Sequence, residues 1–260
     1  MGLQVFDFDG PHGYRLSGRI AEPEGAPRGW AVFAHCFTCG KDSLAASRVT
    51  RALAAHGVGV LRFDFAGLGA SGGTFADSSF AADVEDLVAA GCAMAAAGRE
   101  PALLIGHSLG GASALMAAGA MPSIRAVVTI GAPFDVAQVL RLFDAASLDA
   151  IEADGEAQVH LAGRPFVVRR TLIDGLRRHD PRTRIAELAR PLLIMHAPGD
   201  DTVSIDNATR IFAAARHPKS FVSLDDADHL LTRQADADYV AALVTAWSSR
   251  YLPLAMTARD

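Results

Sequence analysis

The chain has 260 residues, half of them hydrophobic and a fifth charged, which is typical of one large globular domain with a sizeable core. Its net charge is −5 and no dense basic cluster occurs, so nucleic acid is excluded as an expected partner. No apolar run is long enough to span a bilayer, and the N-terminus lacks the features of a signal peptide. Three cysteines are too few for a disulfide framework, so we expect free thiols in a reducing cytoplasm.

The first part of the chain begins with an antiparallel pattern and then alternates strands with helices. Residues 5–8 and 14–21 alternate apolar and polar side chains, which predicts two antiparallel strands joined by a turn over residues 10–13. The elements that the pattern predicts next are a strand at 30–35, a helix at 43–56, a strand at 58–64, a helix over 80–94 and a strand from 101.

The second part repeats this alternation after an interruption. The predicted elements are a strand at 126–130, then strands at 191–196 and 220–224 with helices at 205–216 and 236–250. Strands that alternate with helices indicate a mostly parallel sheet covered on both faces, here made mixed by the antiparallel N-terminal strands. We therefore predict a single α/β domain over residues 1–260.

The interruption at residues 135–190, after the sixth predicted strand, is interpreted as a small lid. Its apolar spacing predicts one amphipathic helix over 139–151, a hairpin around the glycine turn at 162–164, and a further helix at 171–178. Loops beyond the strand ends usually carry specificity, so we expect the lid to line a substrate pocket. The alternatives are a decorated edge without substrate contact, or an apolar surface that forms a homodimer.

The sequence Gly106-His107-Ser108-Leu109-Gly110 joins a short apolar strand to a helix of small residues. This strand–turn–helix context is the one that a nucleophile elbow requires, in which the serine hydroxyl stands clear of a sharp turn. Residues 69–73 also fit the G-x-S-x-G pattern, but no helix begins at Ser71. We therefore predict Ser108 as the nucleophile and interpret the second match as a loop.

A serine nucleophile needs a base, and the base needs an orienting carboxylate. Asp200 follows a late strand and an Ala-Pro-Gly turn, and His229 follows the last predicted strand, which gives the chain order serine, acid, histidine. We predict Asp200 as the acid, with Asp201 as the alternative, and His229 as the base.

Two backbone N–H groups are predicted to form an oxyanion hole. One belongs to Leu109, which follows the nucleophile at a helix N-terminus, and the other to Phe37, in the loop after the strand at 30–35. We expect the substrate pocket to include His35, Cys36, His107, Phe143 and Phe166.

Cys36 and Cys39 form a C-x-x-C pair beside the proposed oxyanion loop. The first interpretation is that they are small buried packing residues. Redox sensitivity is a second interpretation, and metal binding is a third, although two thiolates fill only half of a zinc shell. We expect no metal and no cofactor.

The chain resembles an α/β-hydrolase over essentially its whole length. Residues 35–42, 62–71, 106–111 and 196–201 are similar to one subgroup, the hydrolases fused to or encoded with an OsmC-type peroxidase domain. The resemblance implies a serine esterase that uses Ser108, Asp200 and His229, and it implies an OsmC-type domain or protein as partner. Residues 252–260 are interpreted as the start of a linker to such a module or as a truncation. The chain departs from the superfamily at Cys36, where a glycine is common.

Together these patterns predict a serine hydrolase that cleaves small to medium carboxylic esters through an acyl-enzyme intermediate. The same residues would serve a thioesterase, an amidase or a peptidase, because fold does not decide among them. Two other classes are a non-catalytic binding partner of an OsmC-type module and a thiol-based peroxide scavenger. The scavenger predicts an activity that survives Ser108→Ala and is lost in Cys36→Ser.

Overall fold

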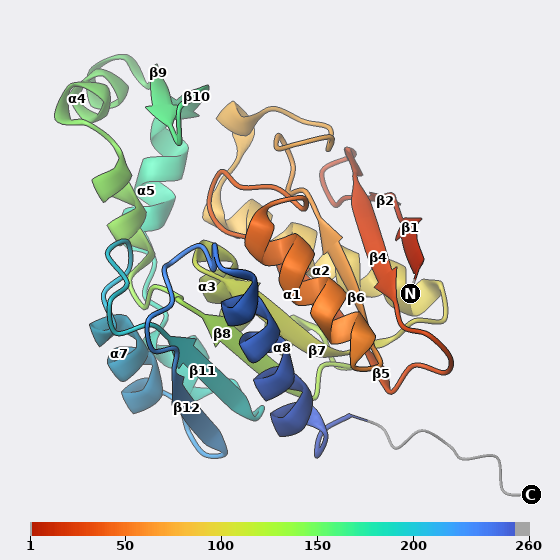
Figure 1. Ribbon diagram of the computed structural model, residues 1–260. Coiled ribbons are helices and arrows are strands. Elements are labelled where there is room, and N and C mark those ends of the chain that lie inside the picture. Colours follow the sequence, from red (N-terminus) through yellow and green to blue (C-terminus); the bar gives the residue numbers. More distant parts are fainter. Residues whose placement is uncertain (1, 253–260) are drawn as a thin grey trace, which may run out of the picture.

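The computed structural model describes residues 2–252, and its centre is a sheet of eight strands (Figure 1). These strands are β1 (Gly2–Val5), β4 (Gly18–Glu22), β5 (Gly29–Ala34), β6 (Val58–Phe63), β7 (Pro101–His107), β8 (Ala126–Ile130), β11 (Leu192–His196) and β12 (Lys219–Ser223). Their order across the sheet is β1-β4-β6-β5-β7-β8-β11-β12. The strands from β6 to β12 run parallel, whereas β4 is antiparallel to both of its neighbours.

Helices cover both faces of the sheet. The described helices are α1 (Leu44–Ala55), α2 (Phe80–Ala96), α3 (Leu109–Ala117), α4 (Ala145–Asp154), α5 (Arg170–Arg178), α6 (Arg182–Ala186), α7 (Asp206–Ala214) and α8 (Gln234–Ser248), with short 3₁₀ helices η1 (Phe75–Asp77), η2 (Ala118–Ala120) and η3 (Val136–Leu142). Figure 1 shows α1 and α8 side by side in front of the sheet. Helices α2, α3 and α7 pack on the opposite face. The predicted α/β fold, a mostly parallel sheet with antiparallel N-terminal strands, is confirmed.

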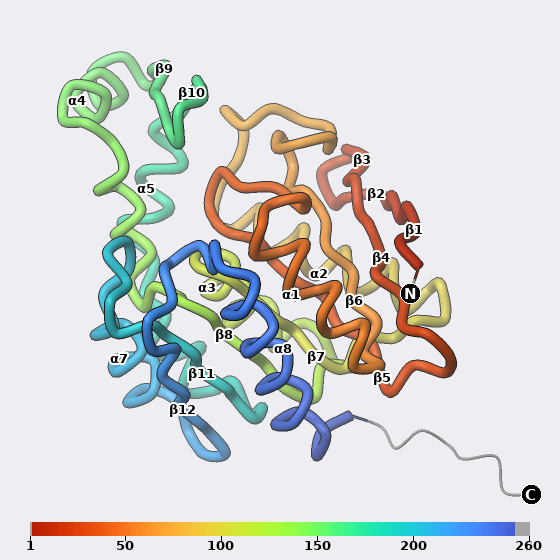
Figure 2. Tube along the Cα trace, in the orientation of Figure 1, coloured from red at the N-terminus to blue at the C-terminus, as the bar shows by residue number. Residues whose placement is uncertain are grey.

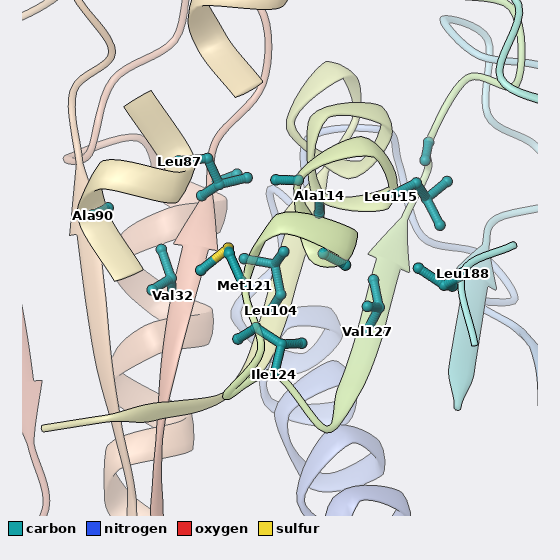
Figure 3. Packing of buried hydrophobic residues seen from close by; sticks show 14 of the residues in the cluster. Val32, Leu87, Ala90, Leu104, Ala114, Leu115, Met121, Ile124, Val127 and Leu188 are labelled. Atoms are coloured by element: carbon teal, nitrogen blue, oxygen red, sulfur yellow. The ribbon is translucent and has the colours of Figure 1, made fainter. Parts of the chain in front are cut away.

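Each face of the sheet has its own hydrophobic cluster. On the α2 and α3 side, Leu87 and Ala114 pack with Val32, Leu104 and other strand residues that are almost wholly buried (Figure 3). On the other side, side chains from α1 and α8 cover the alternate strand positions. Because both faces are buried, the central strands are nearly continuous apolar runs, which explains why the sequence pattern located them.

The N-terminal strands match the prediction only in part. The predicted antiparallel pair around residues 10–13 is present but shorter, joining β2 (Phe8–Asp9) to β3 (Arg15–Leu16) in a separate small sheet, whereas β1 pairs with β4 at the edge of the main sheet. The chain departs from the sheet after β1, makes the small hairpin and returns as β4. The alternating pattern located the extended residues, but the sequence could not show which of them pair.

The insertion after β8 contains η3, α4, the hairpin of β9 (Glu156–Leu161) and β10 (Arg164–Arg169), and α5. Figure 2 shows it standing beyond the end of the main sheet, on the same side as the loops after β5 and β6. The predicted hairpin and last helix are confirmed. The predicted single helix over 139–151 is wrong, because the chain breaks after η3 and the side chain of Asp144 caps α4 by accepting a hydrogen bond from the Ser147 N–H.

Candidate active site

Ser108 lies at a sharp turn between β7 and α3. Its φ of 54° and ψ of −126° are rare for a residue with a side chain. Close backbone packing fixes this turn, because a Cβ on Gly106 would come within 2.2 Å of the Gly110 carbonyl oxygen. A Cβ on Gly110 would come within 2.4 Å of the backbone oxygens of Ala34 and His35. The two glycines thus allow strand and helix to meet closely enough to hold the serine in a strained conformation.

Asp200 and His229 reach this turn from two other strands. Asp200 follows β11, and His229 lies in the loop between β12 and α8. These strands run in the same direction as β7, so their carboxyl ends lie at the same edge of the sheet. The sheet order therefore brings together three side chains that are far apart in the sequence.

The three side chains form one line of hydrogen bonds. The Ser108 hydroxyl lies 3.0 Å from His229 Nε2, and His229 Nδ1 lies 2.7 Å from Asp200 Oδ2. A carboxylate only accepts, so Nδ1 carries the ring proton and Nε2 is free to accept from the hydroxyl. This arrangement can move a proton from the serine oxygen to the imidazole while the carboxylate stabilises the resulting positive charge.

Asp200 is fixed by contacts other than the histidine. Its Oδ1 accepts from the backbone N–H groups of Thr202 at 3.0 Å and Val203 at 2.8 Å. Burial acts to raise the pKa of Asp200, but the hydrogen bonds from His229 and from these N–H groups outweigh it, and the pKa lies below its ordinary value. The carboxylate is therefore ionised, as the orienting role requires. Asp201, the alternative acid, is exposed and does not contact His229.

His107 lies behind the histidine rather than in the pocket. Its Nε2–H donates to the backbone oxygen of His229 at 2.7 Å, and the two rings are 5.2 Å apart. Burial, aided by the positive potential of His229, lowers the pKa of His107 to about 4. His107 is therefore neutral near pH 7 and acts as a fixed hydrogen-bond donor.

Phe37 and Leu109, whose backbone N–H groups are predicted to form the oxyanion hole, both line one small cavity. Leu109 is the first residue of α3, where backbone N–H groups lack helical partners. Within residues 2–252, neither N–H donates to a protein acceptor. Phe37 also lines the larger cavity beside Ser108, so its loop borders that serine.

The loop that carries Phe37 is closed by a disulfide between Cys36 and Cys39. This corrects the expectation of free thiols for these two residues, whereas Cys92 is free and exposed. The physical reason is the left-handed conformation of Thr38, whose φ of 53° turns the chain back and brings the two cysteine Cα atoms to 5.3 Å. Cys36 is buried and Cys39 is half-buried.

A buried ion pair holds the same loop from the other side. The ammonium of Lys41 lies 2.5 Å from Asp64 Oδ2, and the two side chains are 7% and 2% exposed. The Asp64 carboxylate also accepts from the N–H groups of Lys41 at 2.6 Å and Ala70 at 2.9 Å. Asp64 thus joins the loops that follow β5 and β6.

Ser71, the serine of the second G-x-S-x-G match, has a structural role beside this ion pair. Its hydroxyl donates to the backbone oxygen of Asp64 at 2.5 Å and accepts from the N–H of Ser17 at 2.8 Å. No histidine is among its hydrogen-bond partners in the described chain. Its loop interpretation from the sequence is confirmed.

A cavity of about 400 Å³ opens beside Ser108 and His229. Its lining is mainly apolar and comes from the insertion and from the loops after β5, β7, β8, β11 and β12: Cys36, Phe37, Thr38, Cys39, Ser108, Pro133, Gln138, Val139, Arg141, Leu142, Leu161, Ala162, Arg164, Thr202, Val203, His229 and Leu230. The insertion therefore lines the pocket, as its position after β8 suggested.

Four of the five expected pocket residues lie outside this lining, and only Cys36 is part of it. The His35 ring packs against Phe65, and His107 is turned toward the backbone of His229. Phe143 lies against Phe37, and Phe166 lies against Phe75. These two rings support the residues that border the site, because both pack in the hydrophobic cluster that joins the insertion to α2 and α3.

The two arginines and the glutamine of the lining, Arg141, Arg164 and Gln138, were not predicted from the sequence. Gln138 is held by Asn207, whose side chain also accepts from the backbone N–H of Phe134. Nothing in local spacing distinguishes these residues from other polar residues of the insertion. Within residues 2–252, no group of three or more metal-ligating side chains that could hold a metal ion occurs. No helix in the described part of the chain is long and apolar enough to cross a membrane.

The fold and this arrangement of side chains define a hydrolase of the α/β class. The profile of the Alpha/beta hydrolase family matches residues 31–243, and the chain belongs to that family. No curated protein matches the chain significantly.

Several solved structures are similar to the chain. The esterase domain of a Rhodothermus marinus protein is 44% identical with a TM-score of 0.79, covering 97% of this chain and 100% of that one. Hypothetical protein PA2218 from Pseudomonas aeruginosa has a TM-score of 0.81 at 18% identity, covering 96% and 94% of the two chains. Est1E from Butyrivibrio proteoclasticus, solved with ferulic acid, has a TM-score of 0.77 at 19% identity, covering 95% and 98%. The last two show the fold alone.

Proposed function

We propose that this chain is a serine hydrolase that cleaves carboxylic esters through an acyl-enzyme intermediate. The observation that carries the proposal is the hydrogen-bond line from Ser108 through His229 to Asp200. An esterase domain at 44% identity over nearly the whole chain supports the ester substrate class.

In the first half-reaction His229 Nε2 takes the proton of Ser108, whose oxygen attacks the ester carbonyl. The charge on the tetrahedral oxygen is held by the N–H groups of Phe37 and Leu109. One such donor typically contributes about 10²–10³ in rate. His229 then gives the proton to the leaving alcohol, and an acyl group remains on Ser108.

In the second half-reaction His229 deprotonates a water molecule, which attacks the acyl-enzyme and releases the acid. Asp200 keeps the proton on Nδ1 during both halves, so Nε2 faces the reacting oxygen each time. The mainly apolar cavity of about 400 Å³ suits an acyl group of small to medium size.

The first test is labelling with a fluorophosphonate probe followed by peptide mapping. We expect a single adduct on Ser108, its loss in Ser108→Ala, and full labelling in the matched control Ser71→Ala. A folded wild-type protein without an adduct on Ser108 would favour a non-catalytic binding role.

The second test is a panel of 4-nitrophenyl esters of increasing chain length beside acyl-CoA thioesters and aminoacyl amides. We expect the highest kcat/KM on esters, and a loss of about 10⁴ in kcat for Asp200→Asn, because the amide holds the wrong histidine tautomer. A higher kcat/KM on thioesters or amides would assign the same residues to the thioesterase or amidase alternative.

A further inference from the structure

The lining of the cavity beside Ser108 includes two arginine residues. Arg141 lies in the last turn of the 3₁₀ helix η3 and Arg164 is the first residue of strand β10, so they line the cavity from different elements of the insertion. The lining includes no aspartate and no glutamate. Asp200, which lies behind His229, is engaged with the imidazole and with two backbone N–H groups. The open part of the cavity is therefore positively charged.

The charges of these two arginines are not balanced by the protein. Over the described ranges of the insertion, Arg169, Arg177, Arg178 and Arg182 each form an ion pair with an aspartate or glutamate. Arg141 and Arg164 form none within residues 2–252. Arg170, Arg184 and Arg190 also lack an ion pair over the described residues, but none of them lines the cavity, whose two arginines are Arg141 and Arg164.

Arg164 is held in a defined position beside the oxyanion loop. Its guanidinium donates to the backbone oxygen of Thr38 and lies 5.2 Å from the centre of the Phe166 ring. A guanidinium has five N–H donors, so one hydrogen bond and one ring contact leave several donors for a ligand. Thr38 directly follows Phe37, whose N–H is one of the two proposed oxyanion donors, so Arg164 contacts the loop that carries this donor.

Much of the rest of the lining is apolar, with Val139, Leu142, Leu161, Val203 and Leu230 as its branched aliphatic members. A ligand that matches both the arginines and the apolar lining has a reactive ester at one end, a hydrocarbon or aromatic body, and an anionic group at the other end. A carboxylate fits this requirement, because a guanidinium binds it with two parallel hydrogen bonds.

We propose that the site selects esters that bear a carboxylate remote from the scissile bond, and that Arg141 and Arg164 are the specificity-determining residues that bind it. This inference rests on the proposed esterase function. It narrows the substrate class from neutral esters in general to half-esters of dicarboxylic acids, or to esters of alcohols that carry a carboxylate.

The test compares matched substrates that differ only in this charge. On the acyl side, these are 4-nitrophenyl half-esters of dicarboxylic acids from glutaric to suberic acid, each with its monoamide as the neutral partner. On the alcohol side, they are butyrate esters of 4-hydroxybenzoic acid and of 4-hydroxybenzamide. We expect the acid of one series to have a kcat/KM about tenfold above its amide, the equivalent of about 1.4 kcal/mol. Added salt should reduce this preference, because the arginines are open to solvent.

Variants assign the preference to residues. In Arg141→Gln and Arg164→Gln we expect the acid-to-amide ratio to fall severalfold each, through a higher KM rather than a lower kcat, because a remote carboxylate is bound alike in ground and transition states. Lysine at either position should restore part of the ratio, since it keeps the charge and loses the paired geometry. The matched control is Arg184→Gln, an exposed arginine of α6 outside this cavity, which should leave the ratio unchanged.

The outcomes separate this inference from the function on which it rests. Turnover of acids and amides at equal kcat/KM in both series would overturn the carboxylate proposal and leave the esterase intact. A ratio that persists in the double glutamine variant would overturn the assignment to these arginines. Absence of turnover on every ester would refute the esterase itself.

Discussion

Replacing Lys41 by methionine removes one charge of a buried ion pair and leaves the other in place. The two side chains are 7% and 2% exposed, so water does not replace the lost ammonium. Breaking a buried pair in this way costs about 3–5 kcal/mol. The Asp64 carboxylate keeps its hydrogen bonds from two backbone N–H groups, which places the expected loss near the lower end, about 3 kcal/mol. This is roughly a hundredfold in the unfolding equilibrium.

The loss of stability in Lys41→Met should be smaller in acid than at neutral pH. Burial acts to raise the pKa of Asp64, but its hydrogen bonds with Lys41 and Ala70 prevail, and the pKa in the folded protein lies below the ordinary value. In the wild type this contributes stability above the unfolded pKa of about 3.9, and the contribution is lost as the pH falls through the folded pKa. In Lys41→Met burial raises the pKa of Asp64, so protonation relieves the unpaired charge. The difference from wild type should therefore shrink in acid.

Urea unfolding followed by far-UV circular dichroism, at neutral pH and at about pH 4, measures both effects. The matched control is Arg178→Met, whose partner is Asp174 in an exposed pair with side chains 77% and 37% accessible, and whose loss should stay below about 0.5 kcal/mol. Adding Asp64→Asn to Lys41→Met should recover part of the stability. A Lys41→Met loss as small as that of the control, or one that Asp64→Asn does not reduce, would refute the reasoning.

Three further substitutions test other parts of the site. Ser71→Ala should lower the free energy of unfolding by about 1–2 kcal/mol, through two lost hydrogen bonds, and should leave ester turnover unchanged in the same preparation. Gly106→Ala should destabilise by at least about 3 kcal/mol, since its Cβ meets backbone, and a melting temperature equal to wild type would contradict this. His107→Gln should keep the midpoint of the acid limb of the pH–rate profile, because His107, with a pKa of about 4, is already neutral there. A shifted midpoint would mean that it titrates with the reaction.

The sequence predicted most of the parallel sheet because buried parallel strands are apolar throughout. It also predicted the sharp turn at Ser108, because glycines at 106 and 110 are required by close backbone packing. The order of serine, acid and histidine then followed from the position of each residue at a strand end. These signals are local, so a single sequence contains them. The cytoplasmic location and the OsmC-type partner stay predictions, and residues 253–260 of the predicted linker lie outside the described residues.

What could not be predicted depends on contacts between distant segments or on single backbone angles. The Cys36–Cys39 disulfide depends on the left-handed φ of Thr38, which spacing does not reveal. The break after η3 was hidden because apolar residues continue at helical spacing on both sides of Asp144. The positions of Arg141 and Arg164 depend on how the insertion folds over the sheet. The sequence does not show whether a polar residue of the insertion lines the cavity or faces solvent.

The order of strands in the sheet separates the strands that lead to the proposed proton-transfer line from those that do not. The residues of the proposed proton-transfer line follow β7, β11 and β12, whereas the outer strands β1, β4 and β6 supply none of them. Substitutions within strands β1, β4 and β6 should therefore change thermal stability and leave turnover largely unchanged. Substitutions meant to raise thermal stability are best placed in these outer strands. Substitutions meant to change selectivity are best placed in the insertion, which lines the cavity beside Ser108.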